Sequence, residues 1–298
     1  MSAELLTRVA DELLHHPLTV RFAQKIVATD DNRIYTPDDV IGERLLRTAA
    51  LIHHGLEAPG FRPLKANMAD REKTLAWFVG SALKASPYLW TEETRLAARS
   101  CSPLPRHTIS PRLLPQPRMW FTFQTGIGIG GEGDEETIVD AFLVTDSATG
   151  FDCAFIGDMG DAPFLSGHHW DYGKVYPDDY PDDVALESVL SLLAFLNSPY
   201  IPKTTARLSR AARREITRKG LDAIEDEITF IVLRRPEPKR TTHVEEQAVE
   251  WKHRWIVSGH MRAQWYPSEG AHHLIWIAPY LKGPEDAPLL EHAFKVAQ

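Results

Sequence analysis

The sequence is poor in the residues that build covalent or metal-bound scaffolds. It has two cysteines, Cys101 and Cys153, far apart and outside any CxxC spacing. Neither a disulfide framework nor a zinc ribbon is therefore expected. No stretch approaches the roughly 18 consecutive apolar residues of a membrane-spanning helix, and the N-terminal residues include acidic side chains and no long apolar core. We expect a cytoplasmic protein with reduced thiols and no membrane partner.

Positive charge is also in short supply. The 298 residues include 33 Lys and Arg against 41 Asp and Glu, a net charge of −8, which excludes a protein coated with basic residues for nucleic acid. A local basic stripe is not excluded. The motifs GxSxG and HExxH and the P-loop lysine are missing, so hydrolase and kinase sites gain no support. No cofactor is expected.

The first 101 residues have the apolar spacing of helices. With 43% hydrophobic and 25% charged residues, the chain is able to bury a core. Thr36, Pro37 and Asp39 together mark a helix start, because they supply an N-cap, a proline in the first turn and an acid near the positive helix end. We expect that helix to run to about Gly55. Further helical patterns cover 70–85 and 91–99.

A proline-rich connection at 102–117 follows, and prolines interrupt both helices and strand ladders. Residues 118–298 are expected to form one antiparallel α+β domain. Three short β-prone runs separated by turns predict an antiparallel meander at its start, and the strand signals from EITFIVLRR onwards predict a second antiparallel set that closes the fold. We expect a long loop over 162–183, and then a helix that starts at Asp183 and is apolar almost all round. The predicted fold class is α+β: a helical N-terminal portion, then an antiparallel β-sheet region with one buried helix.

Two patterns resemble ligand-binding motifs, but no ligand is assigned to either. Gly126, Gly128 and Gly131 fit GxGxxG, but acidic residues and another β-prone run follow them, so a glycine-rich hairpin loop is predicted. The aspartates between 158 and 183, with His168 and His169, match no metal-loop spacing. A solvated acidic loop is therefore predicted and no metal ligand is assigned; a nonstandard metal site or a partner contact stay open as alternatives.

The segment 203–219 is the one clearly basic stretch. Its cations follow three-and-four spacing, which predicts one helix with a single basic face. That face contains Lys203, Arg207, Arg210, Arg214 and Arg218. Such a face is either a solvated surface or a stripe that follows phosphates, and binding by a stripe would weaken steeply with salt.

Histidine, arginine and aromatic residues gather near the C-terminus. If residues 254–264 form one strand, Arg254, His260 and Arg262 share its polar face. Three interpretations remain open. The row contacts phosphates while Trp265 and Tyr266 stack on bases; or His260 is a general acid or base and Arg262 stabilises developing phosphate charge; or the polar residues are structural and the tryptophans fill a core.

The motif WIVSGHMRAQWYP at 255–267, followed by WIAPYLKGP at 276–284, resembles a signature of a family of phage, prophage and plasmid proteins, especially actinobacterial ones. The resemblance extends to AFLNSP and to the Arg-rich linker before ITFIVLRR, roughly the last third of the chain. No established activity comes with it. The resemblance implies a mobile-element setting, in which regulators, defence components, toxins and counter-defence proteins occur.

These observations lead to three functional hypotheses. The leading one is a mobile-element accessory protein that binds RNA or single-stranded nucleic acid through the Arg-rich helix and the C-terminal His/Arg/aromatic surface. The second is a toxin-like, metal-independent ribonuclease that uses His260 and Arg262. The third is a protein-binding regulator or inhibitor whose acidic loop contacts a basic partner.

Overall fold

The structure is a computed structural model that describes the greater part of the chain's residues. These are residues 1–28, 35–57, 71–99, 109, 111–129, 137–159, 162–174, 176, 183–197, 201–231, 252–257, 260–266, 271–277, 279–284 and 286–290. Of the two cysteines, Cys153 is a free, buried thiol and Cys101 lies outside the described residues. Among the described residues, none of the helices is both long enough and apolar enough to cross a membrane.

Four helices open the chain, in the region that the sequence predicts to be helical. They are α1 (Ala3–Leu14), α2 (Pro17–Ala28), α3 (Pro37–Glu57) and α4 (Arg71–Ala82). The predicted start of α3 is confirmed: Thr36 Oγ1 accepts from the Asp39 amide at 3.3 Å, and Asp39 Oδ2 accepts from the Thr36 amide at 2.7 Å. This reciprocal pair satisfies donors that the first helical turn leaves open. The helix ends at Glu57, slightly beyond the predicted Gly55.

The centre of the fold is a seven-stranded sheet in the order β5-β4-β3-β2-β1-β7-β6. Its strands are β1 (Ser86–Trp90), β2 (Arg118–Ile129), β3 (Thr137–Asp146), β4 (Gly150–Met159), β5 (Ala162–Asp171), β6 (Lys203–Arg207) and β7 (Glu227–Ile231). The strands β2 to β4 are the predicted antiparallel meander, and β5 extends it by one strand. Of the glycine-rich stretch, Gly126 and Gly128 lie within β2, which pairs with β3, and Gly131 lies outside the described residues.

Two details of the sheet differ from the sequence prediction. β1 lies inside the N-terminal region expected to be helical, and it pairs in parallel with β2 and with β7, so the sheet is mixed rather than purely antiparallel. The predicted loop over 162–183 is wrong in its first half, because Ala162–Asp171 is β5, paired with β4. Polar residues such as His169 tolerate this position because β5 is an edge strand with one long side open.

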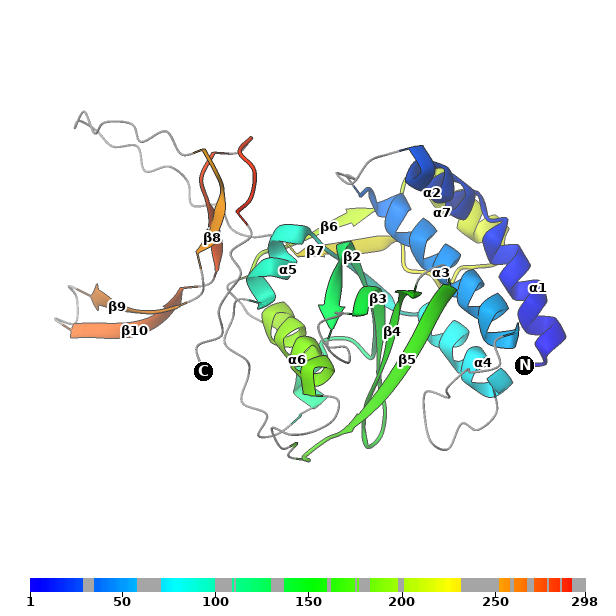
Figure 1. The fold of residues 1–298 in the computed structure, drawn as a ribbon, viewed down its shortest axis with the longest axis horizontal. Helices are drawn as coiled ribbons and strands as arrows, with labels where there is room; N and C mark the ends of the chain where they lie inside the picture. The colour runs from blue at the N-terminus through cyan, green and yellow to red at the C-terminus, as the bar shows by residue number, and fades with distance from the viewer. Residues whose placement is uncertain are drawn as a thin grey trace.

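Helices cover both faces of the sheet (Figure 1). One core cluster joins α1, α3 and α4 to residues such as Trp120 and Leu143; the other joins α5 (Glu92–Arg99) and α6 (Asp183–Asn197) to residues such as Phe121 and Phe142. Neighbouring residues of one strand belong to opposite clusters, as the alternation of a strand requires. The sheet is therefore buried on both sides through its middle.

Helix α6 is the buried helix that the sequence predicts. It begins at Asp183, and Leu186, Val189 and Leu193 in it are fully buried. Its Phe195 ring lies 5.5 Å from the ring of Trp90 in β1. The α+β fold class, with N-terminal helices, a sheet and one buried helix, is confirmed.

The strands predicted after α7 do not form one antiparallel set, because β7 joins the main sheet and the later strands form sheets of their own. β8 (Trp255–Val257) pairs with β11 (Tyr280–Lys282), and β9 (His260–Tyr266) pairs with β10 (Ala271–Ile277), as two separate two-stranded sheets. The single predicted strand 254–264 is thus divided between two sheets. Of the proline-rich connection, the described part includes a short 3-10 turn at Pro111–Leu113.

Buried and exposed positions of β3 predict different costs of substitution. Phe142 is 1% exposed, and its ring lies 4.5 Å from the ring of Phe121 and 6.0 Å from that of Phe155. Phe142→Ala should lower the free energy of unfolding by about 3 to 5 kcal/mol, measured by urea denaturation. Ile138→Ala, near the start of the same strand but 47% exposed, should change it by no more than about 0.5 kcal/mol. Equal losses would contradict the central place of Phe142 in the core.

Candidate nucleic-acid interface

The basic segment 203–219 is not one helix. Residues Lys203–Arg207 form β6, the edge strand of the sheet, and Arg210–Arg218 form α7. The predicted helical face is therefore wrong for Lys203 and Arg207. It is right for Arg210, Arg214 and Arg218, which recur every four residues along α7 and are exposed. We call these three residues the α7 arginine stripe.

Capping signals at both ends explain why α7 forms here. Ser209 is the N-cap, and its Oγ accepts from the Ala212 amide at 3.1 Å. At the other end Gly220 has a φ of 68°, the left-handed region that glycine adopts without strain. The Leu221 amide then donates to the Ile216 carbonyl at 3.0 Å, which completes a Schellman motif. The helix is thus defined by local sequence although its neighbours are strands.

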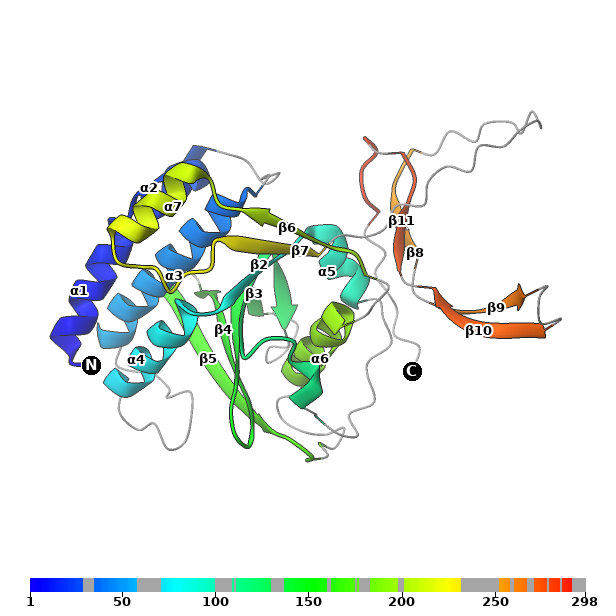
Figure 2. The same ribbon diagram turned by 180° about the vertical axis from the view of Figure 1, so that it is seen from behind.

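The opposite face of α7 is fixed to the N-terminal helices. Ala212 and Ile216 are buried. The Arg21 guanidinium donates to both Glu215 carboxylate oxygens, at 3.2 and 2.9 Å. The Asp38 carboxylate accepts from the Ser209 amide at 2.9 Å and from its hydroxyl at 2.7 Å. These contacts with α2 and α3 leave the arginine stripe as the outward face of α7; Figure 2 shows α7 lying beside α2.

Ion pairing divides the cations of this region into two groups. Arg207 lies 3.6 Å from Glu227, Arg213 lies 3.7 Å from Asp226, and Arg21 is bonded to Glu215. In the part of the chain that the structure describes, no acidic side chain pairs with the second group. That group is exposed and consists of Lys203, Arg210, Arg214, Arg218 and Lys219. Uncompensated positive charge therefore concentrates along α7 and at the start of β6.

Arg254 has a structural environment. Its guanidinium Nη1 donates to Glu93 Oε1 at 2.9 Å, and its Nε donates to the Ala287 carbonyl at 2.7 Å. Its main chain bonds to Pro288 and to Leu290. The side chain is half-buried and connects the C-terminal segment to α5. A role in phosphate contact would have to compete with these bonds.

The remaining predicted residues lie on β9. His260 and Arg262 are two residues apart on this strand, in register with Ile277 and Ile275 of β10. Trp265 and Tyr266 follow at its end, in register with His272 and Ala271. Among the described residues, no group of three His, Cys, Asp or Glu side chains has the geometry of a metal site.

The two predicted parts of the nucleic-acid surface are not adjacent. Figures 1 and 2 place the β9–β10 hairpin at the opposite end of the molecule from α7. The α7 arginine stripe and the residues of β9 therefore do not form one continuous surface. Each has to be tested by itself.

Sequence analysis missed a histidine held between two carboxylates. His169 Nδ1 lies 2.7 Å from Asp152 Oδ1, and its Nε2 lies 3.3 Å from Asp171 Oδ1. Asp152 and His169 are direct cross-strand partners on β4 and β5. Only the recognition of β5 as a strand would have revealed this pairing. Both ring nitrogens of His169 have carboxylate partners. We therefore interpret these three residues as structural, because they connect the edge strand β5 to β4.

His16 lies under α7, at the junction of α1 and α2. It is fully buried, and the Leu18 amide donates to its Nδ1 at 3.3 Å. Burial lowers the pKa of His16 and is opposed by neighbouring Glu215, while Lys219 and Arg21 also favour the neutral ring. The neutral imidazole is therefore the form that fits beneath the helix.

No family model matches this sequence, and no curated protein matches it. Among solved structures, a likeness is found to one described as the crystal structure of AcrVA2. It has a TM-score of 0.39 and 14% sequence identity, and it covers 93% of this chain and 96% of that chain. A likeness at this level carries no argument about function. The resemblance of the C-terminal motif to mobile-element proteins stays a prediction of the sequence.

Loss of the N-cap should loosen α7. Ser209→Ala removes the oxygen that caps the helix and one of the two bonds to Asp38, so the free energy of unfolding should fall by about 1 to 2 kcal/mol. Thr217→Ala, at an exposed position of the same helix, should change it by no more than about 0.5 kcal/mol. Urea denaturation of the full chain measures both. A smaller effect of Ser209→Ala than of Thr217→Ala would refute the capping assignment.

The buried His16 predicts acid sensitivity. Its pKa in the folded chain lies below the unfolded value of 6.5. As the pH falls, His16 is therefore protonated in the unfolded chain before it is protonated in the folded chain. The stability that the neutral ring contributes is complete above about pH 6.5 and is lost as the pH falls through the folded pKa. Between about pH 7 and 5 the unfolding free energy should therefore fall less in His16→Gln than in the wild type. The exposed neighbour variant His15→Gln should keep the wild-type slope; parallel slopes for all three proteins would rule out the assignment.

Proposed function

We propose that the chain is a mobile-element accessory protein that binds RNA or single-stranded nucleic acid, with the α7 arginine stripe as its primary contact. The observation that carries the proposal is the division of the cations. Arg21, Arg207 and Arg213 are neutralised by acids, whereas Arg210, Arg214 and Arg218 are exposed and without an acidic partner among the described residues. Like charges aligned on one helix face repel each other unless an anion covers them.

The chemistry of the stripe fits phosphate. Guanidinium groups bind phosphate oxygens through two parallel N–H bonds, which a lysine ammonium does not reproduce. Successive members of the stripe lie one helical turn apart, about 6 Å along the axis. A row of cations with this regularity follows a backbone of repeating charges rather than a single small anion. Lys203 on the neighbouring edge strand extends the positive surface beyond α7.

The residues of β9 belong to the proposal as a second, separate contact. Trp265 and Tyr266 have the aromatic faces on which unpaired bases stack, and Arg262 supplies a further cation. Because they are remote from α7, the affinity of short ligands should depend on the stripe alone. The ribonuclease alternative rests on His260 and Arg262; cleavage of bound RNA that disappears in His260→Ala would establish it.

The protein-binding alternative rests on the acidic residues that precede α6. Of the loop predicted there, 162–171 is strand β5, and Asp178 to Asp182 lie outside the described residues. Copurification of one specific protein that resists nuclease treatment would favour this alternative.

The salt dependence of RNA binding tests the proposal. Labelled single-stranded RNA is titrated with the wild type and with the triple variant Arg210→Gln, Arg214→Gln and Arg218→Gln, over a series of salt concentrations. With about 0.7 counterions released for each neutralised phosphate of a single strand, the triple variant should reduce the slope of log K against log salt by about 2. Binding at low salt should weaken strongly at the same time.

A charge-matched control separates the stripe from net charge. The variant Arg118→Gln, Lys174→Gln and Lys252→Gln removes three exposed cations on other elements. It should keep the wild-type slope, because these side chains are not part of the basic surface. Equal loss in both triple variants, or no binding by the wild type at low salt, would overturn the proposal.

A further inference from the structure

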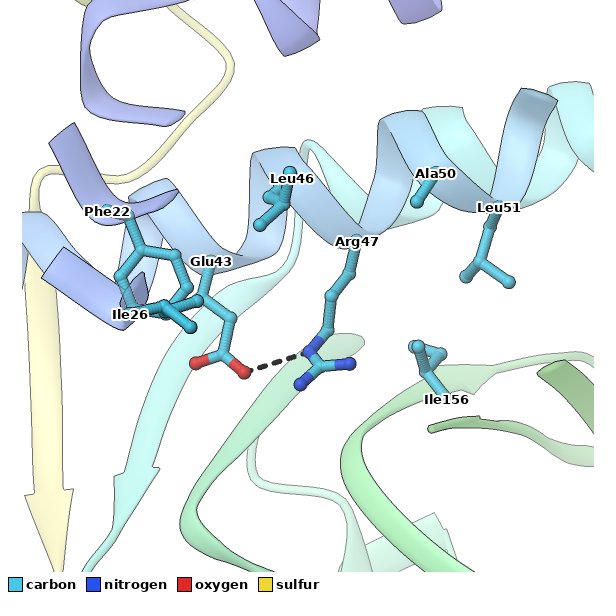
Figure 3. A pocket seen from close by; sticks show the side chains of 8 residues that line it. All are labelled: Phe22, Ile26, Glu43, Leu46, Arg47, Ala50, Leu51 and Ile156. Atoms are coloured by element: carbon cyan, nitrogen blue, oxygen red, sulfur yellow. Dashed lines mark hydrogen bonds and ion pairs between the residues drawn. The ribbon is translucent and has the colours of Figure 1, made fainter. Parts of the chain in front are cut away.

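Open hydrogen-bonding groups lie along the free edge of strand β6 rather than in a cavity. A cavity of about 270 Å³ between α2, α3 and β4 is lined mostly by hydrocarbon side chains. Its charged side chains already bond to each other, because Glu43 Oε1 accepts from Arg47 Nε at 2.8 Å (Figure 3). At one end of the main sheet, β6 pairs with β7 on one side, and no other described strand pairs with it.

The register of β6 shows which of its main-chain groups are open. The Leu208 amide, just beyond the strand, donates to the Asp226 carbonyl at 2.9 Å. Opposite residues of an antiparallel ladder alternate between bonded and non-bonded pairs, so Ala206 and Thr204 are the residues that bond to β7. The remaining residues direct their N–H and C=O groups away from β7, and we call them the β6 edge: Lys203, Thr205 and Arg207.

The β6 edge is open in the structure. The side chains of its three residues are exposed, as is that of Thr204. In the chain as described, the outward main-chain groups make no bond beyond the β7 ladder. Both threonines are β-branched and favour extended backbone. An edge strand with open groups of this kind is a template to which another strand can add.

The open groups fit a polypeptide better than a nucleic acid. Each residue of the β6 edge presents one N–H donor and one C=O acceptor. Phosphate oxygens only accept hydrogen bonds, so phosphates along the edge would leave its carbonyls facing negative charge. An extended peptide presents donors and acceptors in the same alternation and satisfies both.

The charges beside the edge favour an acidic partner over a second copy of the chain. Lys203 and Arg210, before and after the edge, have no acidic partner among the described residues, whereas Arg207 lies 3.6 Å from Glu227. Antiparallel pairing of two copies of β6 about Thr205 would place Lys203 opposite Arg207 of the other copy. Like charges directly opposite each other destabilise a sheet, and an acid opposite Lys203 stabilises it.

We propose that the β6 edge binds an extended acidic segment of another protein, which adds to the main sheet as an eighth strand. The main chain of the segment satisfies the open groups of the edge. A glutamate or aspartate of the segment pairs with Lys203 on one face of the sheet. Because this contact is made by the sheet edge and not by the α7 arginine stripe, it is a binding function beyond nucleic-acid contact.

Fluorescence anisotropy of a labelled peptide, titrated with the full chain, tests the edge. The probe is fluorescein-Gly-Ser-Glu-Val-Thr-Val-Glu-Ser, which places an acid opposite Lys203 in either strand direction. A peptide with lysines in place of both glutamates is the charge control. The glutamate peptide should bind saturably and at least about tenfold more tightly than the lysine peptide.

Two N-methylated peptides test the main-chain bonds without changing the protein. With a glutamate opposite Lys203, the amides of the Glu and Thr residues face β6 and those of the valines face away. N-methylation of the Glu and Thr amides should lower the affinity at least about tenfold. N-methylation of the two valine amides should lower it by much less.

Two variants of Thr205 locate the site on the protein. Thr205→Pro removes an outward N–H and leaves the ladder with β7 intact, as proline is tolerated where an edge N–H faces solvent. It should lower peptide affinity at least about tenfold, while RNA binding and the urea unfolding midpoint stay those of the wild type. Thr205→Ala keeps the N–H and should keep the affinity within about threefold.

A charge reversal completes the test. Lys203→Glu should reverse the preference, so that the lysine peptide binds more tightly than the glutamate peptide. In the α7 triple variant the effect of Thr205→Pro on peptide binding should persist, so failure of the nucleic-acid proposal leaves this one standing. No saturable peptide binding, equal affinities for the glutamate and lysine peptides, or an equal effect of the two N-methylation patterns would overturn the proposal.

Discussion

β1 is the strand through which the two parts of the main sheet are joined. It pairs in parallel with β2 on one side and with β7 on the other, so the β2–β5 meander and the β6–β7 hairpin share one ladder. Leu89 of β1 belongs to the core under the N-terminal helices, and Trp90 belongs to the core under α6. Because α7 lies between β6 and β7 in the chain, its place beside α2 follows from this pairing. The proposed binding surface is therefore positioned by a buried five-residue strand.

Ion pairing on the opposite face of α7 explains why its outward face is positively charged. The chain as a whole is acidic, yet the acids near α7 are already used: Glu215 by Arg21, Asp226 by Arg213, and Asp38 by the N-cap Ser209. The same contacts that fix one face of the helix thus leave the other face without anions. A solvated basic helix in an acidic protein would be expected to attract such acids to its exposed face. Its lack of them among the described residues is what favours an external phosphate ligand.

The sequence predicted those elements whose formation depends on neighbouring residues, such as helix starts. It did not predict contacts between strands that are distant in the sequence. The start of α3 followed from Thr36 and Asp39, and the buried character of α6 from its apolar composition. β1 was missed because a short run between two helices gives no periodicity of its own. The single helix over 203–219 was wrong because three-and-four spacing was counted across the Ser209 cap, where β6 has ended. The His169 contact with Asp152 was missed because it requires the β4–β5 register, which the sequence does not state.

The measurement closest to the central claim is photo-crosslinking of a thiouridine-substituted single-stranded RNA to the full chain, followed by identification of the crosslinked peptides. The account predicts that the dominant crosslinks lie in residues 203–219, and that they disappear when Arg210, Arg214 and Arg218 are replaced by glutamine. Crosslinks confined to the C-terminal strands from residue 252 onwards, with none in 203–219, would contradict it.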